Sequence, residues 1–569
     1  MNLYLTLEDS QTIDEGPHIS GGLSYLKTGD FRINPEHPPL VKELSTLPLL
    51  GLNISIPTDH ESWHNYNQWD FGRQLIYHSS AWPDTIVFLA RLFPIILGLI
   101  LGFYIYRWAK EIFGFQSGLL ALFLYCLSPN FIAHSHLVTT DTALALFFVL
   151  IIYYFGKYLK NPSKKILFVA AIVFALGFNT KYSAVLFIPV LIFIYFWHWL
   201  VKKEKTKLRL KKFLLVFLVF FVITAATTFM LYGFEMKKPL EEPRVQKLYQ
   251  ERQELIDKNL VKTQPLFIQP LVSLANPETK TGSFIYNFAK NISVPAYTYW
   301  RGFFSVLSHN HWGHGAYLMG MTGTQGWWYY FIIAYLIKTP LTTVLLSLFV
   351  FILFVWKKII KNIEIPFWQK IKNIDFKYWL IIWPPLIYFL WSLTSHINLG
   401  VRHILPVYPF IFIGLSSLVS IKIRKRKRKI IYNTGLTLMI IYYLATNIMI
   451  FPFYLSYFNE AIGGPENGHQ YLLDSNIDWG QDVKRLEKWL DKNNIKNYHT
   501  LLFGSLDSSY YLDNQLSFPK NEEVRQNGIS PGYYIISAGP LFDPNGDWHW
   551  PHKYKPINKI GYSIYIYQF

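Results

Sequence analysis

The sequence predicts a polytopic α-helical membrane protein with a small α/β domain after its last span. Hydrophobic residues make up 51% of the 569 residues, a share that is high for a soluble chain of this length. Several apolar runs reach or approach the roughly 20 residues that a helix needs to cross a bilayer. The formal net charge of +18 is concentrated in short loops between these runs. This placement excludes nucleic-acid binding as the reason for the basic composition.

Ten apolar runs follow a polar and aromatic segment at the N-terminus. They occupy residues 86–108, 116–133, 139–158, 166–179, 182–201, 212–233, 327–356, 377–395, 403–421 and 430–455. Pro340 lies inside the seventh run and is expected to kink or break it. The expected organisation is an N-terminal segment, six spans, a long loop, four spans and a C-terminal domain, over residues 1–85, 86–233, 234–326, 327–455 and 456–569.

Charge in the loops predicts how the chain lies in the membrane. Lys and Arg are dense in residues 157–165, 202–212, 357–377 and 422–429, and these loops alternate with less basic or longer ones. By the positive-inside rule the basic loops face the cytoplasm. The N-terminal segment, the long loop and the C-terminal domain are then all external.

The external regions carry their own structural signals. The long loop is rich in Pro, Tyr and Trp, which suits helices that lie on the membrane surface. In the C-terminal domain, Val483, Leu486, Trp489 and Leu490 have helical spacing and predict a helix over 481–493. Runs at 500–503, 533–536 and 563–567 predict strands.

Ionisable residues gather on the predicted outer side. They are Asp14, Glu15, His18, Glu36 and His37 in the first segment, His134, His136, Asp141 and Lys181 at outer helix ends, His309, His311 and His314 in the long loop, and His396, Arg402 and His403 before the ninth span. Ionisable groups near membrane depth are costly, so a cluster on one side indicates a functional site.

Structural alternatives stay open for individual members of this set. Asp141 and Lys181 have the right types to pair with each other, and Asp141 also stands where it would cap a helix. Arg402 is suited to binding lipid headgroups. The three histidines of the long loop also fit an interfacial role.

Two further features argue against a calcium loop and against cysteine-based frameworks. Residues 474–482 place acidic side chains at alternate positions, as in a calcium loop. Trp479 and Arg485, however, occupy the positions that need Gly and the closing Glu, so the segment is predicted to be a turn that caps the following helix. The single cysteine, Cys126, excludes a disulfide framework and a cysteine metal site.

The ordered set of motifs resembles the membrane glycosyltransferases of the GT-C class. The motifs are Asp14-Glu15, the run Asn34-Pro-Glu-His-Pro-Pro-Leu40, Thr139-Thr-Asp141, Thr180-Lys181, Gly326-Trp-Trp-Tyr-Tyr-Phe331, Leu399-Gly-Val-Arg-His403 and Ser475-Asn-Ile-Asp-Trp-Gly-Gln-Asp482. The chain is most similar to the protein O-mannosyltransferase and aminoarabinose-transferase branch, and to bacterial phospholipid-carrier-dependent glycosyltransferases. The likeness covers almost the whole chain.

This resemblance implies an inverting glycosyltransferase of the bacterial inner membrane, with an extracytoplasmic site. A sugar would pass from a polyprenyl-phosphate carrier to a hydroxyl of a protein, lipid or glycan acceptor. The resemblance implies a catalytic role for Asp14, Glu15 and Asp141, with Asp14 as the base. It implies that Lys181, Arg402 and His37 contact the donor phosphate, although His37 stands where relatives have Lys. It also allows a divalent metal ion on Glu36 with His309, His311 or His314.

The resemblance adds one structural expectation, and two alternative functions stay open beside the glycosyltransferase. The family has a helix before the Asp-Glu motif, so a first span upstream of Asp9 is expected. A transporter or flippase of lipid-linked sugars would place ionisable groups near the midplane and show repeat symmetry. A non-enzymatic membrane scaffold would not bring Asp14, Glu36, Asp141 and Arg402 together in space.

Overall fold

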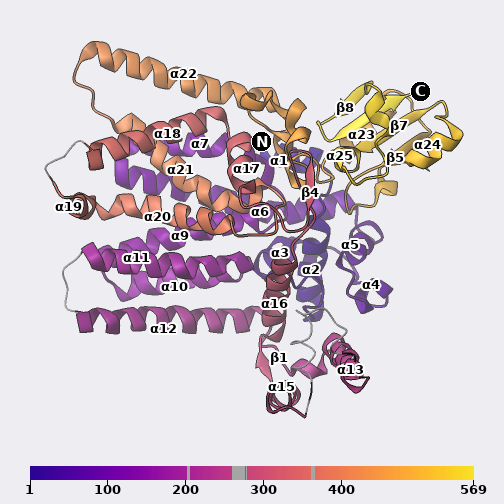
Figure 1. Ribbon diagram of the computed structural model, residues 1–569, viewed down its shortest axis with the longest axis horizontal. Helices are drawn as coiled ribbons and strands as arrows, with labels where there is room; N and C mark the ends of the chain where they lie inside the picture. Colours follow the sequence, from indigo (N-terminus) through magenta and orange to yellow (C-terminus); the bar gives the residue numbers. More distant parts are fainter. Residues whose placement is uncertain (202–205, 259, 261–275, 277, 361–364) are drawn as a thin grey trace.

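The apolar runs fold into a bundle of helices that lie side by side (Figure 1). The computed structural model describes residues 1–201, 206–258, 260, 276, 278–360 and 365–569. Parts of the predicted basic loops at 202–212 and 357–377, and of the long loop, lie outside these ranges. Figure 1 shows the N-terminal helices, α16 and the C-terminal sheet at the same end of the bundle. The segments that were predicted to be external are thus neighbours in space.

The N-terminal segment forms short helices packed against this end of the bundle. They are α1 (Asn2–Glu8), α2 (Glu15–Thr28), α3 (Leu40–Thr46), η1 (Leu47–Gly51), α4 (Glu61–His64) and α5 (Gln68–Tyr77). Ile19 and Leu23 of α2 pack with Phe71 and Leu75 of α5 in a fully buried cluster. Burial of apolar side chains therefore holds the start of α2, and the Asp14 that precedes it, against the rest of the protein.

Seven helices among the described residues are long and apolar enough to cross a membrane. The first block contains α6 (Pro83–Phe113), α7 (Phe115–Cys126), α8 (Pro129–His134), α9 (Asp141–Lys160), α10 (Lys164–Phe178), η2 (Tyr182–Leu186), α11 (Phe187–Val201) and α12 (Thr206–Leu231). The run predicted over 116–133 divides between α7 and α8. Pro129 explains the division, because proline has no N–H for a helix interior and is favoured in the first turn.

The second block continues the bundle. It contains α17 (Tyr330–Lys338), α18 (Leu341–Val355), η5 (Trp356–Ile360), α19 (Phe367–Lys372), α20 (Phe376–Ser392), η6 (Val401–Val407), α21 (Tyr408–Leu415), η7 (Ser416–Ser420) and α22 (Arg426–Ile450). The predicted break at Pro340 is confirmed, since α17 ends before it and α18 begins directly after it. With α7, α10 and α20 the bundle also holds apolar helices shorter than a full span.

The long loop between the blocks is partly helical. Its elements are β1 (Met236–Lys237), η3 (Pro239–Glu241), α13 (Pro243–Asp257), α15 (Lys280–Asn291), β2 (Val294–Pro295), α16 (Tyr297–Trp312), β3 (Ala316–Leu318) and β4 (Met321–Gly323). Tyr299 of α16 packs with Tyr182 of η2, with ring centroids 5.2 Å apart. This contact brings α16 next to Lys181, one residue before η2.

The C-terminal domain is a five-stranded sheet with strand order β6-β5-β7-β9-β8. Its strands are β5 (Tyr498–Leu501), β6 (Gln515–Ser517), β7 (Tyr533–Ser537), β8 (Asn558–Ile560) and β9 (Ile564–Gln568), and its helices are α23 (Val483–Lys492), α24 (Asn521–Asn527) and α25 (Ala538–Phe542). Single turns lie at η8 (Tyr454–Ser456), η9 (Glu460–Ile462), η10 (Pro465–Gln470), η11 (Asp474–Asn476), η12 (Ser508–Tyr510) and η13 (Trp550–Lys553). The predicted helix and the strands predicted at 533–536 and 563–567 are confirmed, whereas the strand predicted at 500–503 lies two residues earlier, as β5. The edge strands β6 and β8 were missed because each has only three residues.

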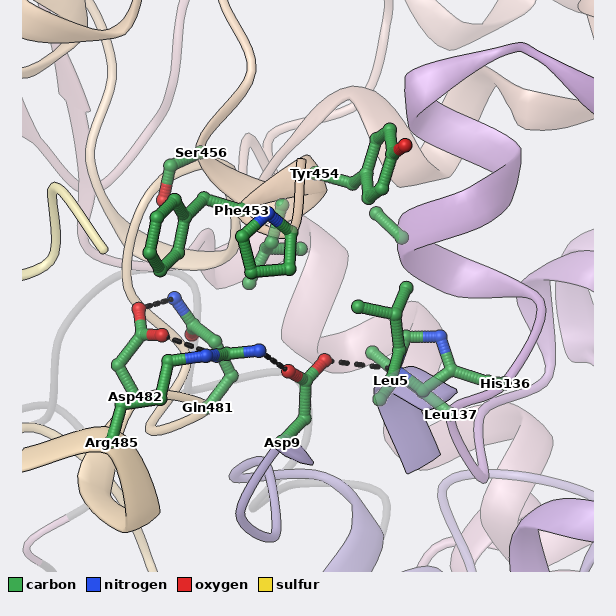
Figure 2. Close-up of a pocket in the computed structure, with 13 residues that line it drawn as sticks. Leu5, Asp9, His136, Leu137, Phe453, Tyr454, Ser456, Gln481, Asp482 and Arg485 are labelled. Carbon is green, nitrogen blue, oxygen red and sulfur yellow. Dashed lines mark hydrogen bonds and ion pairs between the residues drawn. The ribbon is translucent and has the colours of Figure 1, made fainter. Parts of the chain in front are cut away.

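The two ends of the chain are tied together by hydrogen bonds. The backbone N–H groups of Ser10 and Ile13 donate to the carbonyls of Gln481 and Trp479, both at 3.0 Å. Figure 2 shows the Arg485 guanidinium between the carboxylates of Asp9 and Asp482. The segment that leads into Asp14 is therefore fixed on the C-terminal domain.

Candidate active site

One large cavity, of about 480 Å³, opens at the end of the bundle where the segments that were predicted to be external meet. One part of its wall is polar and is formed by Asp14, Glu36, His37, Lys181, Arg402 and Asp474. Another part is apolar and is formed by Leu186, Phe303, Val306, Leu307, Phe331 and Trp391. A cavity lined by both charged and apolar side chains suits a ligand that has an ionic head and a hydrocarbon chain.

Arg402 is the central cation of the polar wall. Its Nη1 lies 2.6 Å from Oδ2 of Asp14 and 3.9 Å from Oδ2 of Asp141. The guanidinium carbon also lies 4.2 Å from the centre of the Trp479 ring, which adds a cation–π contact. Gly400 permits this placement, because a Cβ there would lie 2.6 Å from the Ser475 hydroxyl.

Asp141 is the first residue of α9 and is buried behind Lys181. Its Oδ1 accepts a hydrogen bond from Lys181 Nζ at 2.6 Å, and Lys181 itself lines the cavity. The two residues do pair, as one sequence alternative proposed, and they do so beside Arg402. The capping alternative is wrong, since Thr140 occupies the cap position and makes no side-chain cap.

Asp14 is held by one carboxylate oxygen only. It stands at the start of α2, and its side chain makes no cap there. Oδ2 accepts from Arg402, whereas no hydrogen bond from the described residues engages Oδ1. The side chain is 21% exposed. Asp14 thus presents a free carboxylate oxygen to the cavity, with its position set by Arg402.

Glu15, for which a catalytic role was predicted, is not among the residues that line this cavity. Its side chain is fully buried and forms an ion pair with Arg91 at 2.6 Å. Its oxygens also accept from the backbone N–H groups of Thr12 and Val138, at 2.9 and 3.0 Å. Burial would raise the pKa of Glu15, but Arg91 outweighs it and holds the pKa below its usual value. Both oxygens of the Glu15 carboxylate are thus engaged, and these contacts hold the segment next to Asp14 against α6.

His37 lines the cavity, in surroundings that disfavour a positive charge on its ring. Burial lowers its pKa well below the usual value, and its Nδ1 has no hydrogen-bond partner among the described residues. Its ring centroid lies 4.9 Å from that of His18, whose pKa burial lowers to about 4. A neutral imidazole can donate a hydrogen bond to a phosphate but cannot neutralise it. The positive charge at the cavity therefore comes from Arg402 and Lys181.

The residues predicted to bind a metal ion do not gather into one ligand set. His309 Nε2 and His314 Nδ1 lie 2.9 Å apart on the cavity wall, which Glu36 also lines. His311 instead packs on Trp312, with ring centroids 5.4 Å apart. Across the described ranges, no group of three or more His, Cys, Asp or Glu side chains is arranged to hold a metal ion. Metal binding stays a prediction, and no chemical step below uses it.

The segment 474–482 belongs to the site, which sequence reasoning missed. Asp474 and Trp479 line the cavity. The predicted cap is wrong: Asp482 stands at the cap position of α23 but caps nothing, because its carboxylate accepts from Ser563 at 2.6 Å and pairs with Arg485. The unusual density of Asp and Trp in this segment was the available signal. Its partners lie too far away along the chain to be found without the structure.

Comparison with known proteins gives one family match. Residues 86–229 match the model of the family described as dolichyl-phosphate-mannose-protein mannosyltransferase. This match spans α6 to α12 and includes Asp141 and Lys181. No curated protein matches the chain.

Solved structures of two membrane enzymes resemble the chain over nearly its whole length. ArnT from Cupriavidus metallidurans, solved in the apo state and bound to undecaprenyl phosphate, has 12% identity and a TM-score of 0.44 over 99% of this chain and 95% of its own. The oligosaccharyltransferase AglB from Archaeoglobus fulgidus, in complex with an inhibitory peptide and a dolichol-phosphate, has 11% identity and a TM-score of 0.44 over 98% of this chain and 71% of its own. The family match confirms, for residues 86–229, the predicted resemblance to membrane glycosyltransferases of the protein mannosyltransferase branch.

Proposed function

We propose that this protein is an inverting glycosyltransferase that moves a sugar from a polyprenyl-phosphate carrier to a hydroxyl acceptor on the outer side of the membrane. One observation carries the proposal. Asp14, Lys181 and Arg402 come from three distant segments and line one cavity, with Asp141 bound directly behind them. A non-enzymatic scaffold gives no reason for this convergence. A flippase would need ionisable groups along the span, whereas Asp14, Asp141 and Lys181 lie at the starts of α2, α9 and η2.

Asp14 has the geometry of a general base. Its free Oδ1 can accept the proton of an acceptor hydroxyl, while Arg402 holds Oδ2 in place. The acceptor oxygen then attacks the anomeric carbon as the bond from that carbon to the phosphate oxygen breaks. The proton goes to Asp14, and the electron pair leaves with the carrier phosphate. Direct displacement of this kind inverts the anomeric centre.

Arg402 and Lys181 supply the positive charge that the departing phosphate needs. Both are held by carboxylates, Arg402 by Asp14 and Lys181 by Asp141, so their positions are set before the donor binds. Preorganised cations of this kind stabilise charge that develops in the transition state. Arg402 is also suited to bidentate binding of phosphate oxygens. We assign Asp141 the role of orienting these two cations.

The apolar wall supports a lipid-linked donor. Phe303 and Leu307 of α16 face the cavity together with Leu186 of η2, next to the charged wall. A polyprenyl chain can leave the site along these side chains while its phosphate stays at Arg402. The family match includes mannose in its description, so mannose is the first donor sugar to test. A Ser or Thr hydroxyl of an exported protein is the first acceptor to test, ahead of a lipid or a surface glycan.

The test is transfer of radiolabelled mannose from synthetic undecaprenyl-phosphate mannose by the purified full-length chain. We expect the wild type to release label from the carrier to an acceptor. Asp14→Asn should slow transfer by about 10²- to 10⁴-fold, the range for loss of a general base. Its melting temperature should fall much less than on loss of a fully buried pair, because Asp14 is partly exposed and Arg402 keeps Asp141 at 3.9 Å. Asp59→Asn, at an exposed position of the same segment, is the matched control and should keep full activity.

Two results contradict the proposal. Full activity of Asp14→Asn would show that Asp14 is not the general base. If the wild type binds the carrier but releases label from none of a panel of undecaprenyl-phosphate sugars, a carrier-binding or flippase function replaces the transferase.

A further inference from the structure

The loop Asp474–Trp479 joins the C-terminal domain to the cavity. Asp474 and Trp479 both line the cavity wall, and Trp479 lies under the Arg402 guanidinium. Trp479 contacts Arg402, whereas the proposed mechanism leaves Asp474 unused. A carboxylate at the wall of a binding cavity, contributed by a different domain from the base, calls for an explanation.

The loop is held rigidly against the segment that carries Arg402. The Asn476 side chain accepts from the Val401 N–H at 3.1 Å, and its backbone carbonyl accepts from Lys338 Nζ at 2.6 Å. Ser475 donates from its hydroxyl to the Leu399 carbonyl. Lys338 is itself buried, so these bonds are shielded from water. Asp474 therefore keeps a fixed place relative to Arg402.

Asp474 has unused hydrogen-bonding capacity that faces the cavity. Its Oδ1 accepts a hydrogen bond from the Ser475 N–H, and a carboxylate has further lone pairs that can accept hydrogen bonds from a ligand. Its backbone has a φ of 57°, in the left-handed region that residues other than glycine adopt at a cost. Burial raises the pKa of Asp474, and the charge of Arg402 opposes this effect. A half-buried carboxyl group that is held in this backbone conformation at a cavity wall favours a ligand that donates hydrogen bonds.

We propose that Asp474 binds hydroxyl groups of the sugar that is transferred, so that the C-terminal domain takes part in selecting the donor sugar. The inference rests on the proposed function, because it takes the phosphate to lie at Arg402 and Lys181. The sugar is bonded to that phosphate and must lie beside it, within reach of the loop. A carboxylate repels phosphate but accepts hydrogen bonds from hydroxyls, so Asp474 is a residue for the sugar and not for the phosphate.

The test measures binding of lipid carriers without acceptor, in detergent or nanodiscs. Undecaprenyl phosphate without a sugar is compared with each member of a panel of undecaprenyl-phosphate sugars that begins with mannose. The variants are Asp474→Ala and Asp474→Asn, with Asp513→Asn as the matched control at an exposed site of the same domain. We expect the wild type to bind one sugar-bearing carrier more tightly than undecaprenyl phosphate. Asp474→Ala should lose about 10- to 100-fold in affinity for that carrier only.

Asp474→Asn sharpens the result, because an amide oxygen still accepts a hydrogen bond from a hydroxyl but carries no charge. We expect a smaller loss than for Asp474→Ala, with affinity for undecaprenyl phosphate unchanged or higher in both variants. If Asp474 had only a structural role, its variants would bind carriers with and without a sugar more weakly by the same factor. They would also melt at a lower temperature than the wild type.

The outcomes separate this inference from the proposed function. If the wild type prefers a sugar-bearing carrier and the Asp474 variants keep that preference, the inference is overturned while the transferase function stands. Equal weakening of both carriers also overturns it. If the wild type binds neither carrier, the proposed function is wrong and the inference falls with it.

Discussion

Asp14 and Glu15 are neighbours in the sequence, yet they belong to two differently built regions. Each carboxylate pairs with an arginine at 2.6 Å, Asp14 with Arg402 and Glu15 with Arg91. The Asp14 pair lies at the cavity and leaves one carboxylate oxygen free. The Glu15 pair is fully buried, and both of its oxygens accept hydrogen bonds.

The buried region extends from Glu15 to the contact drawn in Figure 2. There Asp9 accepts from His136 at 2.9 Å and pairs with Arg485, which also pairs with Asp482. These pairs join the N-terminal segment to the turn between α8 and α9 and to α23. A carboxylate–arginine pair therefore does not by itself indicate an active site. A free oxygen and an adjoining cavity distinguish the pair that can do chemistry from the pairs that hold the chain in place.

The largest effect is expected from breaking the Glu15–Arg91 pair. Glu15→Gln leaves Arg91 buried without a counter-charge, and loss of one partner of a buried pair costs about 3–5 kcal/mol. The variant should unfold at a lower temperature, measured by thermal melting in detergent. Glu61→Gln, at an exposed position of the same segment, should melt like the wild type. A stable Glu15→Gln that lacks activity would instead return Glu15 to a catalytic role.

The second prediction concerns Arg402, the arginine of the functional pair. Arg402→Ala should slow transfer from undecaprenyl-phosphate mannose by about 10²- to 10³-fold, because a preorganised donor to the leaving phosphate is lost. Binding of undecaprenyl phosphate should weaken as well, while Arg402→Lys should keep part of both. Arg525→Ala, an exposed arginine of the C-terminal domain, serves as the control. Unchanged carrier binding by Arg402→Ala would show that the phosphate lies elsewhere.

The smallest expected effect is a pH dependence of folding stability. It arises from Asp478, a buried carboxyl group without an arginine partner. Burial raises its pKa to about 7. Because this folded-state pKa lies above the unfolded value of about 3.9, the stability it contributes is fully present below pH ~4 and is lost as the pH rises through about 7. Between pH 5 and pH 8 the wild type should lose about 1–3 kcal/mol relative to Asp478→Asn, which has no proton to release.

Melting temperatures of the two proteins at pH 5 and pH 8 give this difference directly. Buried histidines such as His18 affect both proteins alike, so they cancel in the comparison. Parallel pH profiles for wild type and Asp478→Asn would mean that Asp478 is already ionised in the folded protein.

Much of the architecture follows from the sequence. Apolar runs and their spacing predict the helices of the bundle, and Pro340 marks the break between α17 and α18. Alternation and helical spacing predict α23 and the central strands of the C-terminal sheet. These signals are local, since each depends on residues within one element. The motif resemblance also selected Asp14, Lys181 and Arg402, which the structure places on one cavity.

Only the tertiary structure decided which of these residues are free to act. The partner of Glu15 is Arg91, which lies inside the apolar helix α6, and the contacts of Ser10 with Gly480 and Val483 span more than 460 positions. Such pairs leave no periodic signal in the sequence. Whether a carboxylate has its oxygens saturated or one oxygen open to a cavity depends on those distant partners. The residue types determined what chemistry this chain can carry, and the packing of its two ends around the bundle decided where.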